Sequence, residues 1–218
     1  NAAVPVHINS GNPKYPFPQF LEYEGSKLGN LGTQNAEGVV HAEMEQDIRD
    51  AWQIHANEFD YSGDELNGVK YIWRPTGDGK PYDCSESDGY TLLAAAYMAD
   101  KVTFDGLWLY THDRRITKYK RHIDGVMNYP TWEYQKGSLI EGESQGAAPD
   151  GVYDCVMGLY VAWKQWGDKM GIKDASGEDI SYRKDLIRVL RGLVEKGVFQ
   201  AETNPYSKAL YSGCIGFD

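Results

Sequence analysis

The stretch SESDGYTLLAAAYMA, residues 85–99, joins a cluster of serines and carboxylates directly to a run of apolar helix-forming residues. Apolar residues occupy every face of the run, which is typical of a buried helix. Acids near a helix N-terminus interact well with the backbone N–H groups and the helix dipole, so capping is one explanation for Asp88. Capping explains Glu86 less well, because glutamate is a mediocre cap and Glu86 precedes Gly89 at the start of the helix.

A second segment repeats this arrangement. Residues 151–165, GVYDCVMGLYVAWKQ, are apolar almost all round and follow Asp150, with capping again one explanation for Asp154. If the two buried helices begin at the same end of a cavity, Glu86 and Asp150 face each other across it. Burial can keep one carboxyl protonated while a better-solvated neighbour stays ionised, which is what cleavage of a glycosidic bond requires.

Three further helices are expected over residues 41–57, 103–119 and 181–196. Each has an apolar stripe at helical spacing and a polar face, with Thr103 and Ser181 as expected N-caps and Gly197 as the expected stop of the last helix. Amphipathic and fully apolar helices therefore alternate along the chain. This order predicts an all-α protein in which covering helices alternate with inner ones, as in an α/α toroid.

The regions between the helices are rich in glycine, proline and aromatic residues. Residues 1–37 are expected to be an extended arm or a set of loops, and residues 38–218 to be the helical domain. Residues 58–83 and 120–150 are expected to be long loops without regular structure. Loops of that length usually have a function.

Charge and composition exclude several classes of partner. The 218 residues carry a net charge of −10, so phosphate-rich surfaces such as nucleic acid and anionic membranes are poor partners. No window approaches the roughly 20 apolar residues of a membrane helix. The 6 Trp and 16 Tyr are consistent with surfaces that bind sugar rings, although most should simply fill the core. The N-terminal residues 1–5, NAAVP, fit either the mature end of a secreted protein or an arbitrary boundary.

Cysteines and histidines do not form a recognisable metal site. Cys84, Cys155 and Cys214 are odd in number and lack zinc-type spacing, as do the histidines. Residues 60–71, DYSGDELNGVKY, lack the glycine and glutamate of a calcium loop. We therefore expect no metal and no cofactor. Cys84 is expected to be a small buried residue facing Cys155, with a disulfide between them as an open alternative.

Two motifs resemble glycoside hydrolase family 8. SESDGYTLLAAAYM (85–98) followed by TFDGLW (103–108) is similar to the family's Ser/Thr-Glu helix and its F-D-x-L-W element. APDGVYDCVMGLYVAWKQWG (148–167) is similar to its A-[ST]-D-G-D helix, in the form of the xylanase-like branch. Pro149 and Val152 depart from the pattern, Val152 standing where the family has an acid. The resemblance covers roughly residues 40–170.

The resemblance implies a role for five residues. Glu86 would be the general acid, and Asp150 would bind the sugar at the point of cleavage. Trp132 and Tyr134 match an aromatic segment that supports the sugar. Tyr90 would lie near Glu86, although a plain core tyrosine is the alternative for that residue. The implied activity is hydrolysis of a β-1,4-linked polysaccharide such as xylan, cellulose or mixed-linkage glucan, with inversion, by a secreted enzyme.

The resemblance also implies that the chain is the first half of an (α/α)6 toroid. The general base of the family lies farther along than residue 218, and five helices cannot close a toroid of twelve. A truncated chain, a proteolysed enzyme and a natural short member are all consistent with this. We expect the missing half, or a second copy, to cover the open apolar face. A carbohydrate-binding or scaffold module on the same fold is the alternative function, whereas the acidic helix starts disfavour a polysaccharide lyase.

Overall fold

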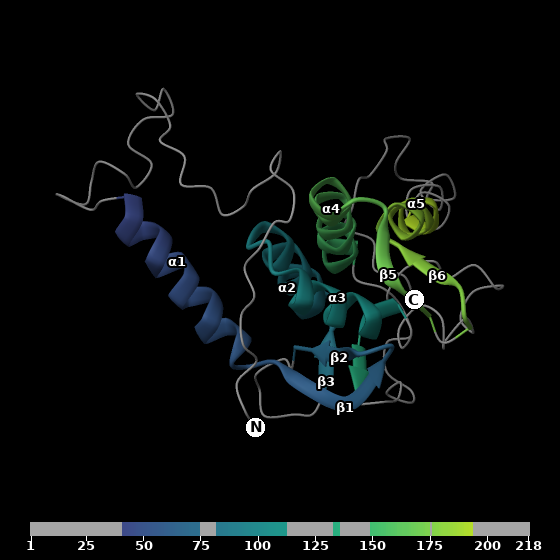
Figure 1. Cartoon of the computed structure of the whole chain (residues 1–218), viewed down its shortest axis with the longest axis horizontal. Coiled ribbons are helices and arrows are strands. Elements are labelled where there is room, and N and C mark those ends of the chain that lie inside the picture. The colour runs from purple at the N-terminus through teal and green to yellow at the C-terminus, as the bar shows by residue number, and fades with distance from the viewer. Residues whose placement is uncertain (1–40, 75–81, 113–132, 136–148, 175, 194–218) are drawn as a thin grey trace, which may run out of the picture.

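The computed structural model describes residues 41–74, 82–112, 133–135, 149–174 and 176–193. Within these residues there are five helices and six short strands (Figure 1). The helices are α1 (His41–Ala56), α2 (Ser85–Tyr97), α3 (Lys101–Tyr110), α4 (Pro149–Trp166) and α5 (Tyr182–Gly192). The strands are β1 (Asp60–Leu66), β2 (Val69–Trp73), β3 (Tyr82–Cys84), β4 (Glu133–Gln135), β5 (Lys169–Lys173) and β6 (Asp179–Ser181). The five predicted helices are therefore confirmed, but their bounds differ: α4 is longer than predicted, α3 begins two residues earlier, and α1, α2 and α5 end earlier than predicted.

Helices α2, α3 and α4 form the centre of the described structure (Figure 1). The core fills the space between them and the neighbouring strands, and its largest fully buried side chains come from α2, α3, α4, α5 and β2: Trp73, Trp108, Tyr182, Phe104, Leu92, Leu107, Leu109 and Leu159. Burial of such side chains is the main favourable contribution to folding.

Helix α3 is an inner helix, and the expectation that it would be a covering one was wrong. All residues from Thr103 to Tyr110 are buried. The N-cap is Asp100 and not Thr103, because the Asp100 carboxylate accepts hydrogen bonds from the Thr103 backbone N–H (3.1 Å) and from the Thr103 hydroxyl (2.8 Å). The polar residues of this helix point to buried partners rather than to solvent, which the helical pattern alone does not reveal.

Helix α5 packs against α4, whereas α1 lies to one side and contacts the centre through its C-terminal end (Figure 1). The Trp52 indole N–H of α1 donates to Asp100 (3.0 Å), and His55 lies 3.3 Å from the Thr91 hydroxyl of α2. Helix α5 begins as expected at Ser181, whose hydroxyl accepts a hydrogen bond from the Lys184 backbone N–H (3.0 Å). The contacts of Trp52 and His55 place only the C-terminal end of α1 near α2.

Two antiparallel hairpins and one long-range strand pair connect or flank the helices within the described ranges, so the expected loop at residues 58–83 is wrong over most of its length. Strands β1 and β2 pair through a turn at Asn67 and Gly68, which both have positive φ (51° and 80°). An Asn-Gly pair between strands favours such a turn. Strands β3 and β4 pair so that Asp83 lies opposite Tyr134, and β5 pairs with β6. Strand β3 leads directly into α2.

Several expectations fall on residues outside the described ranges. They concern the N-terminal arm (1–37), Trp132, Gly197, Cys214 and much of the loop 120–150. In the described part, Cys84 and Cys155 both carry thiols, so the alternative of a disulfide between them is wrong. None of the described helices combines the length and apolarity needed to cross a membrane.

Candidate active site

The first turns of α2 and α4 lie in direct contact. A Cβ atom added to Gly151 would lie 2.4 Å from the carbonyl carbon of Ser85 and 2.6 Å from the backbone nitrogen of Glu86. A Cβ atom added to Gly89 would lie 2.4 Å from the carbonyl oxygen of Gly151. Glycine is therefore required at both positions for this close backbone approach. As a result, the two helices that bear Glu86 and Asp150 begin at one shared end.

The acids at this shared end do not cap α2. The Ser87 hydroxyl accepts a hydrogen bond from the Cys84 backbone N–H (3.3 Å) and donates to the Cys84 carbonyl (2.9 Å). Asp88 is the fourth residue of α2 and is 1% exposed. Glu86 is half-buried and accepts a hydrogen bond from the Ser85 hydroxyl (3.1 Å). Ser87, as the third residue of α2 in a capping box with Cys84, therefore performs the capping that was one explanation for Asp88.

Asp154 is a further carboxylate at this end. It is the sixth residue of α4, beyond the first turn, so it does not cap that helix. Its Cβ would lie 3.1 Å from a Cβ added to Gly89, which places it between the two helices. Burial raises the pKa of the Asp154 carboxyl, and the neighbouring Asp150 carboxylate raises it further. Asp150 is exposed, so the two acids experience different environments.

Tyr90 lies in the field of these carboxylates. The charges of Asp154 and Asp150 raise the pKa of the Tyr90 phenol, with smaller contributions from desolvation and from Glu86. Its side chain is 56% exposed, so the alternative of a core tyrosine does not hold. We call Glu86, Tyr90, Asp150 and Asp154 the acidic cluster. The sequence missed Asp154 as a member, although its spacing of four residues from Asp150 puts both on one helix face.

The backbone of the expected aromatic segment lies next to the acidic cluster. Cys84, the residue before α2, pairs with Glu133 of β4, and Asp83 pairs with Tyr134. Strand β4 therefore runs beside the start of α2, two residues away from Glu86. This pairing brings a segment 50 residues later in the chain to the same end of the molecule.

The face of α4 next to the acidic cluster is open and apolar. Tyr153, Met157 and Tyr160 recur at helical spacing and are 38%, 43% and 43% exposed. Val152, which stands where the family motif has an acid, is instead 1% exposed and belongs to the core. Position 152 therefore does not contribute to the acidic cluster.

The acidic cluster has no arrangement typical of a metal centre. Within the described ranges, no group of three or more His, Cys, Asp or Glu side chains is disposed to hold an ion. Burial raises the pKa of the Cys84 thiol, so this cysteine is predominantly protonated at neutral pH. The chemistry that the cluster can perform is therefore that of carboxyl groups, which donate, accept or hold protons.

Comparison with known proteins places the chain in a family. The sequence profile of glycosyl hydrolases family 8 matches residues 48–201. The reducing-end xylose-releasing exo-oligoxylanase Rex8A of Paenibacillus barcinonensis is 32% identical over 193 residues, or 84% of this chain and 44% of that protein. A beta-glucanase of Niallia circulans is 29% identical over 185 residues, or 81% of this chain and 40% of that protein.

The fold agrees with this match. The structure of a reducing-end-xylose releasing exo-oligoxylanase is similar with a TM-score of 0.57 at 24% identity, over 77% of this chain and 40% of that one. The chain thus spans about 40% of the length of such relatives. The five helices of the described residues correspond to part of the (α/α)6 toroid of these enzymes. The chain belongs to glycosyl hydrolases family 8.

Proposed function

We propose that this protein hydrolyses a β-1,4-linked polysaccharide with inversion at the anomeric carbon, and that Glu86 and Asp150 act at the point of cleavage. The observation that carries the proposal is the contact between Gly151 and the Ser85–Glu86 backbone, which brings the two acidic helix starts together. Xylan, cellulose and mixed-linkage glucan are the candidate polymers, since the relatives are named xylanase, beta-glucanase and endoglucanase.

In the proposed reaction Glu86 is the general acid. It donates its proton to the glycosidic oxygen as the bond to the anomeric carbon breaks, while a water molecule attacks from the opposite face of the ring. A separate carboxylate, the general base, must take the proton of that water. Neither Glu86 nor Asp150 is proposed for this role. The Ser85 hydroxyl holds one oxygen of Glu86 at 3.1 Å and so limits the orientations that the carboxyl can adopt.

Asp150 is proposed to bind the sugar rather than to transfer a proton. Its exposed carboxylate can accept hydrogen bonds from ring hydroxyls and stabilise the positive charge of an oxocarbenium-like transition state. Asp154 would reinforce this charge from the adjacent helix turn. Tyr90, Tyr134 and Trp132 are the aromatic residues proposed to contact sugar rings.

A polysaccharide-binding module without hydrolytic activity is the second candidate. It is favoured by the buried Val152, because the family motif has an acid at that position and this chain lacks it there. Such a module would still bind sugar through the acidic cluster and the aromatic residues. The two functions are separated by measuring binding and hydrolysis in the same preparation.

The decisive experiment measures release of reducing sugar from xylan, carboxymethylcellulose, mixed-linkage glucan and chitosan by the product of the complete reading frame. Glu86→Gln should lower the rate by about 10²–10⁴-fold, the usual contribution of a general acid, and leave polymer binding intact. Glu65→Gln, at an exposed site on β1, is the matched control and should keep full activity. Unchanged hydrolysis in Glu86→Gln removes this residue from the mechanism, and binding without hydrolysis in the unaltered protein supports the module.

We further propose that the remaining helices of the toroid cover the open face of α4, and that the protein acts outside the cell, where such polymers occur. Tyr153, Met157 and Tyr160 form an apolar patch suited to helix packing. Gel filtration with mass spectrometry tests whether the protein in solution contains the additional helices, because it gives the mass of the particle. A stable monomer with only the mass of this chain would contradict it, and an intracellular protein in fractionation would contradict the location.

A further inference from the structure

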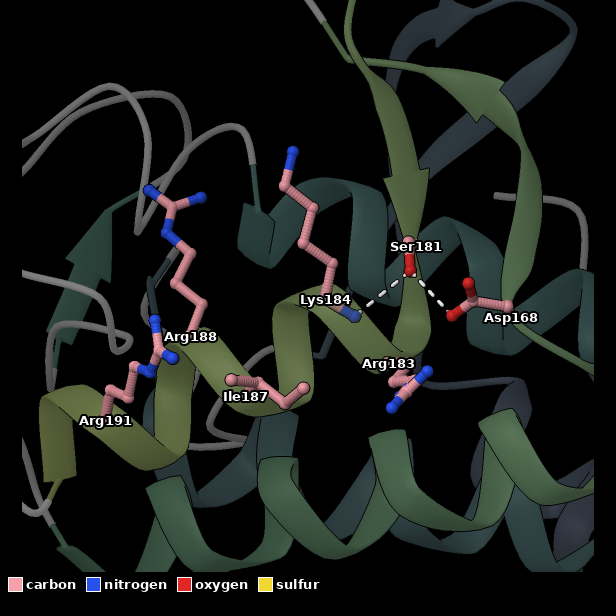
Figure 2. Close-up of a pocket in the computed structure, with 7 residues that line it drawn as sticks. All are labelled: Asp168, Ser181, Arg183, Lys184, Ile187, Arg188 and Arg191. Atoms are coloured by element: carbon pink, nitrogen blue, oxygen red, sulfur yellow. Dashed lines mark hydrogen bonds between the residues drawn. The ribbon is translucent and has the colours of Figure 1, made fainter.

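A groove on the outer side of α5 is lined mainly by basic side chains (Figure 2). It has a volume of about 530 Å³, within the range of small-molecule sites. Seven residues line it: Asp168, Ser181, Arg183, Lys184, Ile187, Arg188 and Arg191. Four of them are cations, in a chain whose net charge is −10. The groove is therefore a local reversal of the charge of the molecule.

The basic side chains follow one side of α5 because of their spacing. Lys184, Arg188 and Arg191 are separated by four and three residues, so they share a helix face and extend over about 10 Å along its axis. Asp185, the acid within this stretch, is buried on the other side and accepts a hydrogen bond from the Trp108 indole (2.9 Å). Lys184 forms an ion pair with Glu178 (3.1 Å), so the positive charge of the groove side of α5 comes mainly from Arg188 and Arg191.

The two ends of the groove offer different chemistry (Figure 2). At one end the Ser181 hydroxyl donates to one oxygen of Asp168 (2.9 Å), and the Asp168 carboxylate is exposed. At the other end, the Arg191 side chain is exposed. The Ile187 side chain, 39% exposed, lies between the two ends.

We propose that this groove binds a carboxylate-bearing sugar unit of a polysaccharide, such as a uronic acid side group. The guanidinium groups of Arg188 and Arg191 match a carboxylate, which arginine can bind through two parallel hydrogen bonds. Asp168 accepts hydrogen bonds from sugar hydroxyls, and Ile187 packs against the C–H face of a ring. Free phosphate or sulfate fits the groove less well, because at neutral pH these anions have no hydroxyl that could donate a hydrogen bond to the Asp168 carboxylate.

This inference rests on the proposed function for its choice of a polysaccharide, and it places a second, separate site on the same protein. The groove residues belong to α5 and to the β5–β6 hairpin, whereas the acidic cluster belongs to α2 and α4. Binding at the groove would hold a polymer to the enzyme through its charged side groups. It would therefore affect affinity for decorated polymers without taking part in bond cleavage.

The test is affinity electrophoresis of the full chain in native gels that contain either glucuronic acid-bearing xylan or unsubstituted xylan. Retardation should be stronger in the acidic polymer, and added salt should abolish the difference. The double variant Arg188→Gln/Arg191→Gln should lower the affinity for the acidic polymer about tenfold, if each charged contact contributes as exposed pairs commonly do. Affinity for the unsubstituted polymer should stay the same.

The control is Lys70→Gln, which removes an exposed charge from β2, outside the groove lining, and should not change binding. Arg191→Gln alone, at an exposed side chain, gives a smaller effect in the same direction and guards against misfolding of the double variant.

Equal retardation by both polymers, or an unchanged affinity of the double variant for the acidic polymer, would overturn the proposal. Binding of poly-glutamate with the same affinity would show that the groove recognises carboxylates in general and not an acidic sugar. Because the readout needs no hydrolysis, an inactive protein that still prefers the acidic polymer contradicts the proposed function alone.

Discussion

Two groups of carboxylates in this molecule differ in how they are compensated. Between α3 and α5, the buried Asp105 accepts hydrogen bonds from Lys101 and Tyr182, and the buried Asp185 accepts one from Trp108 with His112 at 3.8 Å. In the acidic cluster, Asp150 and Asp154 have neither a hydrogen bond nor a cation among the described residues.

The difference separates a structural from a functional interpretation of acids. Burial raises the pKa of both Asp105 and Asp185, and the neighbouring donors and cations lower it in part, so folding itself satisfies these groups. Asp150 and Asp154 instead repel each other on one helix face, which destabilises the fold. Acids kept at a cost to stability are typical of active sites. Removing an acid should therefore lower the free energy of unfolding in the first group and raise it in the second.

The largest effect on stability is expected for Asp185→Ala. The change leaves the Trp108 indole N–H without its buried acceptor and His112 without its carboxylate, so the free energy of unfolding should fall by about 3 kcal/mol. Denaturant unfolding measures this value. If the loss is below about 1 kcal/mol, the interactions of Asp185 with Trp108 and His112 do not stabilise the fold. Asp185 would then not differ from the acids of the acidic cluster in this respect.

A smaller loss is expected for Gly151→Ala, which tests the contact that forms the acidic cluster. The new methyl group would press on the Ser85–Glu86 backbone, and overpacking of this kind costs about 1–3 kcal/mol. Gly158→Ala on the same helix is the control, because its nearest contact would be a milder 3.3 Å. If both variants are equally stable, the two helix starts are not in close contact.

Asp154→Asn should stabilise the protein slightly. Removing one of two like charges four residues apart on a helix should raise the free energy of unfolding at pH 7 by about 0.2–0.5 kcal/mol. Because the folded-state pKa of Asp154 is raised, the folded protein binds more protons than the unfolded one from about pH 4 up to that pKa. The unaltered protein therefore loses stability as pH rises through this window.

The pH profile provides the matching control. The advantage of Asp154→Asn should grow as pH rises from about 4 and level off above the folded-state pKa, as measured by urea unfolding at several pH values. Asp179→Asn should show the opposite trend, because the hydrogen bond from Lys173 lowers the pKa of the Asp179 carboxyl in the folded protein. An Asp154→Asn variant that is less stable than the unaltered protein at pH 7 would show that Asp154 is a structural acid.

Sequence alone predicted the helices well and the rest of the fold less well. The apolar runs that became α2 and α4 are long and periodic, so their type follows from local pattern. The covering role predicted for α3 was wrong, because Asp105 has buried partners that lie 77 residues away, at Tyr182, and no local pattern contains them. The β1–β2 hairpin was missed even though Asn67-Gly68 signals such a turn.

In the candidate site, too, contacts between distant segments could not be predicted from local sequence patterns. The shared start of α2 and α4 was predicted from two similar segments, and the reason for it, a glycine from each helix at their contact, emerges from the packing. Asp154 was considered only as a possible cap, because its place in the acidic cluster depends on α2 as its neighbour. The pairing of β3 with β4 joins residues about 50 positions apart, which sequence spacing could not have shown.

The most direct test of the account replaces Asp150 by asparagine and measures hydrolysis and the free energy of unfolding in the same protein. We predict that Asp150→Asn lowers polymer hydrolysis by at least about 10²-fold, as expected for lost transition-state stabilisation. The free energy of unfolding should change by no more than about 0.5 kcal/mol, since the residue is exposed at a helix start. A variant that keeps its activity but loses stability would show that Asp150 serves the fold, and would contradict the central claim.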